Sequence, residues 1–115
     1  MKFEQLDVWK RSSRLACDIY KALANCKDYG FKDQVTRSAI SIPSNIAEGS
    51  GRNTWKELHQ FRGYSIGSAA ELDTQIIIAK KLNYLDDTSV QEVLAILEKT
   101  RKLLSGYKKY VKTKY

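Results

Sequence analysis

Apolar residues recur every three or four positions along most of this chain, with polar residues between them. This spacing is typical of one helix face, and short polar breaks divide it into four segments. We expect helices at about residues 6–25, 31 or 32–49 and 55–82, and a fourth that ends near residue 111. The expected N-caps are Asp7 for the first helix, Asn53 or Thr54 for the third, and Thr88 or Ser89 for the fourth.

Short connections between amphipathic helices favour antiparallel neighbours. The expected fold class is therefore all-α, an antiparallel up-down-up-down four-helix bundle. A length of 115 residues fits a single domain, residues 1–115, with a basic C-terminal tail from about residue 108.

The second predicted helix carries the only proline of the chain, Pro43, inside a continuing apolar face. Because proline removes a backbone donor, we expect a kink within a turn of Pro43 and no strand or loop there. Gly49 is expected to end this helix as a left-handed C-cap. Asn45 and Glu48 share its last turn, and Asn45 is expected to bond carbonyls that Pro43 leaves unpaired.

The third predicted helix is unusually rich in small residues around Gly63, Gly67 and Ser68. Glycine destabilises a helix interior by up to ~1 kcal/mol relative to alanine, so we expect another backbone, from this chain or another subunit, to approach closely. Glu71 is expected to hydrogen-bond a neighbouring helix or pair with a basic residue. It lies roughly 25 Å beyond the preceding turn, so contact with Glu48 in one subunit is not expected. The functional alternative is an acid-lined site of Asn45, Glu48 and Glu71.

The strings LDVWKRSSRLACDIY, SIPSNIAEGSGR and GSAAELDTQIIIAKKLNYLDD resemble bacterial four-helix bundle proteins first noticed as reading frames within intervening sequences of large-subunit ribosomal RNA genes. The resemblance implies a left-handed antiparallel bundle that assembles as a homopentamer. A distantly similar protein, the accessory variability determinant of retroelements, binds nucleic acid and a reverse transcriptase, which implies RNA or DNA and a nucleic-acid-processing protein as partners. This chain departs from the family pattern at residues 62–66, where RGYSI replaces an alanine-rich approach to Gly67.

The net charge of +7 is concentrated at the C-terminus, because all 13 acidic residues precede residue 99 and seven of the 20 basic residues follow residue 98. The ammonium and guanidinium groups attract phosphates, and an interleaved tyrosine can stack on an exposed base. The candidate nucleic-acid-binding residues are Lys99, Arg101, Lys102, Lys108, Lys109, Tyr110, Lys112 and Lys114. Secondary phosphate candidates, each otherwise expected on a solvated or salt-bridged face, are Arg11, Arg14, Arg37, Arg52 and Arg62.

Several kinds of chemistry lack the residues they need. The single histidine, His59, has no glutamate three residues before it, which excludes a di-iron bundle site, and GSGR at residues 49–52 does not fit a phosphate-binding loop. We expect no catalytic residue, metal or cofactor. The N-terminus has no apolar signal-peptide core, and no run approaches the ~20 apolar residues of a membrane span, so a cytoplasmic protein without membrane association is expected.

The sequence therefore predicts a homo-oligomeric, non-enzymatic accessory protein associated with RNA or DNA. The first alternative is a structural or protein-interaction scaffold whose basic tail only confers solubility. An enzyme that uses the acidic residues is the weakest alternative.

Overall fold

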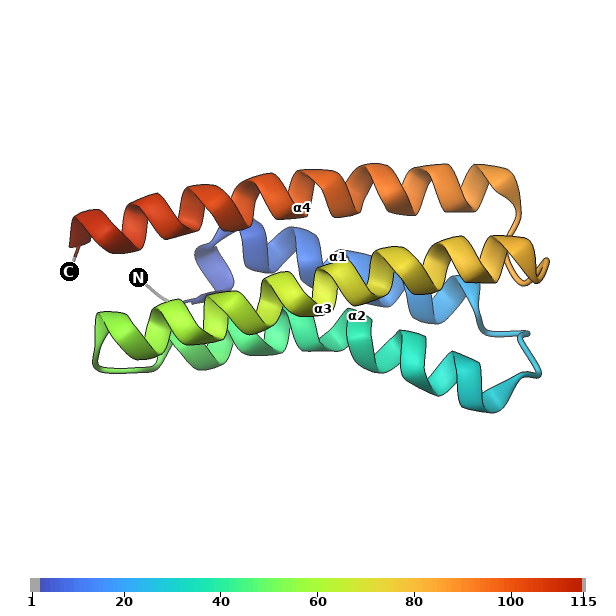
Figure 1. The fold of residues 1–115 in the computed structure, drawn as a ribbon, viewed down its shortest axis with the longest axis horizontal. Coiled ribbons are helices and arrows are strands. Elements are labelled where there is room, and N and C mark those ends of the chain that lie inside the picture. Colours follow the sequence, from blue (N-terminus) through green and yellow to red (C-terminus); the bar gives the residue numbers. More distant parts are fainter. Residues whose placement is uncertain (1–2, 115) are drawn as a thin grey trace.

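The computed structural model describes the backbone of residues 3–114 and the side chains of residues 3–106. A short 3-10 helix, η1 (Phe3–Gln5), precedes four α-helices, α1 (Asp7–Ala22), α2 (Tyr29–Ser50), α3 (Trp55–Lys81) and α4 (Asp87–Lys114). Residues 3–114 contain no strand, so the predicted all-α class is confirmed. Figure 1 shows successive helices running in opposite directions along the long axis.

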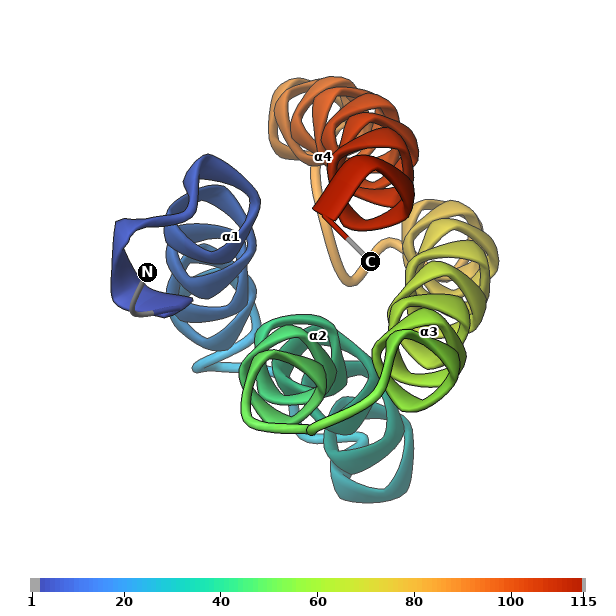
Figure 2. The same cartoon turned by 90° about the vertical axis from the view of Figure 1, so that its left-hand side faces the viewer.

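One apolar core lies between the four helices, and all four contribute buried residues to it. On α2, the residues Val35, Ala39, Ile42 and Ile46 are at most 1% exposed. Burying one large aliphatic side chain stabilises a fold by roughly 1.5–3 kcal/mol. Figure 2 shows the helices around this core in chain order, with α2 between α1 and α3. Within the described residues, none of the helices combines the length and apolar composition that crossing a bilayer requires.

The helix α2 continues through Pro43, as predicted, and Figure 1 shows that it bends near its middle. Ser65 of α3 donates a hydrogen bond of 2.9 Å to the Ile42 carbonyl, so α3 is attached to α2 directly beside the proline. The Asn45 amide donates at 2.8 Å to the Ser41 carbonyl. This carbonyl is not the one that Pro43 leaves without its helical partner, which belongs to residue 39, so the role expected of Asn45 is corrected.

The N-caps of the helices are partly as predicted. Thr54 caps α3, and its hydroxyl oxygen accepts the Glu57 N–H at 3.2 Å. The prediction for α1 is wrong, because Leu6 occupies the cap position without a side-chain bond and Asp7 is already helical. At α4, the Asp86 carboxylate accepts the Ser89 N–H at 2.7 Å, so the helix begins before the predicted caps.

Three other helix ends differ from the prediction by two or three residues. The helix α1 ends at Ala22 instead of residue 25, and α2 begins at Tyr29 because Asp28 accepts the Phe31 N–H at 3.2 Å. The helix α4 extends to Lys114. Local sequence leaves such ends loosely determined, since the last turn of a helix needs few of its own contacts.

Gly49 does not end α2 as a left-handed cap. The helix runs on to Ser50, and none of the glycines in the described backbone has a positive φ. Gly49 is buried against α3, where a Cβ atom would lie 2.9 Å from the Cβ of Phe61. By contrast, a Cβ on Gly63 or Gly67 would meet nothing within 4 Å, so the expected close approach to these two glycines does not occur within this chain.

A hydrogen bond joins the two connections at one end of the bundle. The Tyr84 hydroxyl, between α3 and α4, donates to the Asp28 carboxylate, between α1 and α2, at 2.7 Å. The bond to Tyr84, together with that from the Phe31 N–H, lowers the pKa of Asp28. The same bond raises the pKa of Tyr84, because the neutral phenol is the donor.

Replacing Tyr84 by phenylalanine is expected to lower the urea midpoint at pH 7. A carboxyl with a depressed folded pKa contributes stability that is complete above its unfolded pKa of about 3.9 and lost as the pH falls through the lower folded value. The gap between wild type and Tyr84→Phe should therefore be largest between about pH 5 and 9 and shrink below about pH 4. Urea unfolding of both proteins at pH 7 and pH 3 measures this, and a gap that stays constant would contradict it.

Candidate nucleic-acid interface

Arg101 of α4 has an ion-pair partner on the neighbouring helix α3. Its guanidinium forms an ion pair with the Asp73 carboxylate of α3, and both side chains are partly buried, with exposed fractions of 38% and 27%. The pair links two neighbouring helices. This ion pair gives Arg101 a structural role, and its predicted contact with a phosphate stays a prediction.

Lys99 and Lys102 lie beside a third cation that comes from another helix. Together with Arg11 of α1 and the side chain of Leu103, they line an open hollow of about 270 Å³ between α1 and α4. Lys102 is paired only loosely, with Glu98 at 3.7 Å on the exposed surface. Within residues 3–106, neither Lys99 nor Arg11 forms an ion pair. Long cationic side chains around an open hollow are suited to bind phosphate.

The other predicted contacts, Lys108, Lys109, Tyr110, Lys112 and Lys114, lie outside the described side chains. Their backbone belongs to α4, which is one helix as far as Lys114. Seven residues make about two helical turns, so position 109 follows Lys102 on the same face of α4. The hollow and the C-terminal lysines therefore belong to one helix.

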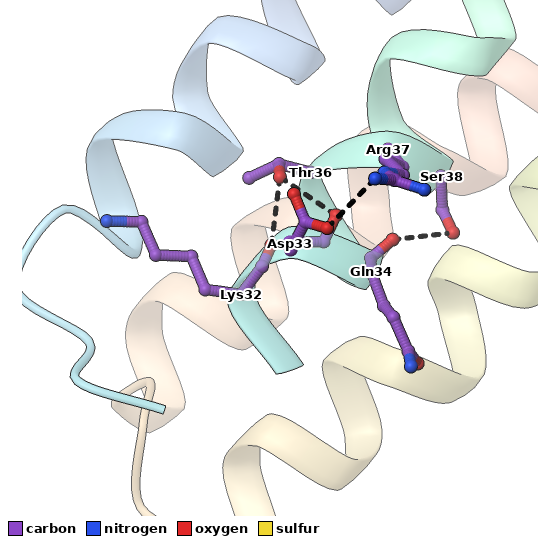
Figure 3. Close-up of polar contacts among 6 residues, drawn as sticks. All are labelled: Lys32, Asp33, Gln34, Thr36, Arg37 and Ser38. Carbon is purple, nitrogen blue, oxygen red and sulfur yellow. Dashed lines mark hydrogen bonds and ion pairs between the residues drawn. The ribbon is translucent and has the colours of Figure 1, made fainter. Parts of the chain in front are cut away.

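A polar hollow lies between α2 and α3, and it includes residues from two of the three strings that carry the family resemblance, Ser41 from one and Ser68 and Glu71 from the other. It has a volume of about 270 Å³ and is lined by Gln34, Arg37, Ser38, Ser41, Ser68 and Glu71. Figure 3 shows its α2 side, where Arg37 pairs with Asp33 at 3.2 Å and the Ser38 hydroxyl donates to the Gln34 carbonyl. Among residues 3–106, the partner of Glu71 is Gln75 of its own helix, which donates a long bond of 3.4 Å, so neither the expected bond to a neighbouring helix nor the expected pair with a basic residue is formed there.

Glu48 is separate from Glu71, as predicted. It pairs with Arg52 at 2.6 Å in the last turn of α2, and the Arg52 guanidinium also lies 4.8 Å from the centre of the Phe61 ring. The three residues Asn45, Glu48 and Glu71 therefore do not form one acid-lined site. Each instead has a local partner on its own helix or just beyond its end.

The sequence left the five secondary arginines equivalent, but the structure separates four of them, and the fifth, Arg14, is exposed on α1. Arg37 and Arg52 are salt-bridged, as expected for exposed helix residues. Arg11 joins the hollow on α4, a juxtaposition that no local pattern indicates. Arg62 was expected on a solvated or paired face but is buried, with only 7% of its surface exposed.

The chain is similar to a known protein family. A family model described as 23S rRNA-intervening sequence protein matches residues 4–106. No protein with a curated description matches the chain. The matched span includes both hollows and ends just before the lysines at 108, 109, 112 and 114.

Proposed function

Because the chain belongs to the 23S rRNA-intervening sequence protein family, we propose that it is a non-enzymatic accessory protein that binds nucleic acid, with RNA as the first ligand to test. One observation carries the proposal: Arg11, Lys99 and Lys102 gather around an open hollow on the helix that also bears the C-terminal lysines. A stretch without a single acidic residue from 99 to 115 keeps this region positive. Cations so arranged attract the phosphate backbone of any sequence.

Binding of this kind releases counterions, so its affinity falls as the salt concentration rises. It needs no bound metal and no catalytic group. The protein would act in the cytoplasm by covering or positioning a nucleic-acid strand, and a nucleic-acid-processing protein would be an additional partner.

We also propose that the protein is a homo-oligomer, a homopentamer by the family resemblance. The outer side of α3 supports an intermolecular contact, because Gly63 and Gly67 leave room there and Tyr64 and Ile78 are 49% and 40% exposed. A ring of identical subunits would repeat the basic hollow and strengthen the positive electrostatic potential around it. Sedimentation at micromolar concentration tests the assembly, and a monomeric mass would remove it.

Changing Arg11, Lys99 and Lys102 together to glutamine is expected to weaken RNA binding and to flatten its salt dependence. For a single strand, the log-log salt slope should fall by about 0.7 for each phosphate that the variant no longer neutralises, hence by up to about 2 for three. A mobility-shift assay at 50 and 200 mM salt, with wild type alongside, measures both quantities.

A matched control changes Lys21, Lys27 and Lys81 to glutamine. These three residues are exposed near the opposite connections of the bundle, so net charge falls equally without touching the hollow. If both triple variants lose the same affinity, only overall charge matters and the hollow is not the site.

The scaffold alternative is favoured by exposed apolar side chains at the C-terminal end of α3, where Ile77 and Leu82 are 45% and 49% exposed. A folded, oligomeric protein that binds neither RNA nor DNA at 50 mM salt would support this alternative and exclude nucleic-acid binding.

A further inference from the structure

Arg62 is a largely buried cation that forms no ion pair with any side chain of residues 3–106. It lies two turns into α3, on the face that packs into the bundle, and is 7% exposed. Its Nε atom is buried without an acceptor, and no hydrogen bond or ion pair joins its guanidinium to any side chain of residues 3–106. Burial alone lowers the pKa of Arg62, with no neighbouring carboxylate to oppose the shift.

Burying an arginine side chain without a partner is unfavourable for folding. A guanidinium stays protonated in proteins, so it cannot escape burial by losing its proton. Removing a charge from water without a counter-charge is strongly unfavourable, and native structures therefore pair buried charges or bind an ion beside them. The Nε–H group of Arg62 is buried with no acceptor among residues 3–106, and an anion from outside the chain would supply that acceptor.

A second unpartnered donor lies on the same face of α3. The indole Nε1 of Trp55, seven residues before Arg62, is buried and has no acceptor. Leu58 lies between the two on this face and packs against Trp55 and Leu6. This end of α3 thus presents two N–H donors and an apolar floor, a combination suited to an anion with several acceptor oxygens.

The helix opposite Arg62 supplies no counter-charge. The pairs Lys80–Asp87 and Asp73–Arg101 fix the antiparallel register of α3 and α4. Continued towards the start of α3, this register places Arg62 level with the backbone of α4 beyond Gly106. The sequence there contains four lysines and no acidic residue, which favours a multiply charged anion over a single carboxylate.

We propose that Arg62 and Trp55 form part of a buried site for a phosphate group at the end of the bundle where α3 begins. The site goes beyond the proposed nucleic-acid binding, because it takes a phosphate whether free in solution or at the end of an oligonucleotide.

The test compares wild type with Arg62→Met in phosphate and in chloride of equal ionic strength. In chloride, Arg62→Met is expected to melt higher than wild type, by on the order of 5 °C, because a buried unpaired charge has been removed. In phosphate at ten times its dissociation constant, wild type should gain about 5 °C and Arg62→Met nothing. Arg37→Met, which removes an exposed arginine, serves as the control and should respond to phosphate like wild type.

A second measurement uses Trp55 as a reporter. The chain has two tryptophans, so in a Trp9→Phe background the selectively excited tryptophan fluorescence comes from Trp55 alone, and phosphate should change it in a saturable way that Arg62→Met abolishes. A trinucleotide with and without a 5′-phosphate separates the sources. Tighter binding of the phosphorylated form than of inorganic phosphate identifies an oligonucleotide end, and equal binding identifies free phosphate.

Three results would overturn the phosphate site. The first is an equal phosphate response in wild type and Arg62→Met. The second is a wild type that phosphate neither stabilises nor perturbs in fluorescence. The third is a phosphate-insensitive wild type whose oligomer dissociates on Arg62→Met, since the anion would then be a carboxylate of a second copy.

Discussion

Replacing Gly49 by alanine is expected to destabilise the protein by about 1–3 kcal/mol, the range for forcing an extra methyl group into a packed contact. The new Cβ would lie 2.9 Å from the Cβ of Phe61 and 3.5 Å from the Leu58 carbonyl oxygen. Neither atom is the free end of a flexible side chain, so α2 and α3 would have to separate. Urea unfolding monitored by circular dichroism measures the loss.

Gly106 provides the control for this experiment. It is an exposed residue of α4 whose Cβ would meet nothing within 4 Å. Alanine there should stabilise the protein by up to ~1 kcal/mol through helix propensity alone. The two substitutions are chemically identical, so opposite signs would show that packing at Gly49 decides. A stabilising Gly49→Ala would mean that α2 and α3 do not pack this closely.

Changing Lys108, Lys109, Lys112 and Lys114 together to glutamine is expected to reduce the affinity for single-stranded RNA roughly 10²- to 10³-fold near 0.1 M salt. The estimate assigns a salt slope of about 0.7 to each phosphate contact and assumes that all four lysines make one. The variant should remain folded, because these residues follow the last buried leucine, Leu104. Fluorescence anisotropy with a labelled oligonucleotide over a salt series measures both affinity and slope.

The control here is Tyr110→Ala, which leaves the charge unchanged. It should not alter the salt slope, but it should weaken binding to single strands more than to duplexes, because stacking on an exposed base is worth about 1–3 kcal/mol. If the four-lysine variant binds RNA as tightly as wild type, the tail is a solvated terminus, and binding would depend on the hollow at Arg11, Lys99 and Lys102 alone.

The helices could be predicted from the sequence because their apolar residues recur with helical spacing, and even Pro43 did not interrupt that spacing. The role of Gly49 could not be predicted from the sequence. Glycine is suited both to a left-handed cap and to a close helix contact, and only the position of Phe61 on another helix decides between them. The cap at Asp7 was wrong for a similar reason, since a preceding 3-10 turn already places Leu6 at the cap position.

The residues of the candidate site were likewise only partly predictable from the sequence. Charge counting identified α4 as the basic helix, but a count cannot tell an arginine held by Asp73 from a lysine facing an open hollow. Arg11 joins that hollow through tertiary packing between the first and last helices. The burial of Arg62 was also beyond the sequence, because its position continues the spacing of Leu58 and Ser65 yet its residue type indicates a surface.

The bond between Tyr84 and Asp28 has a consequence for how the bundle opens. It ties both connections at one end of the molecule, while the opposite end holds both chain termini and only the α2–α3 turn. Amide hydrogen exchange should therefore be slowest in the helix turns nearest the tie and fastest towards the termini. The basic hollow and the start of α3 lie away from the tied end, so the regions proposed to bind phosphate are expected to exchange faster than the helix turns near Tyr84 and Asp28.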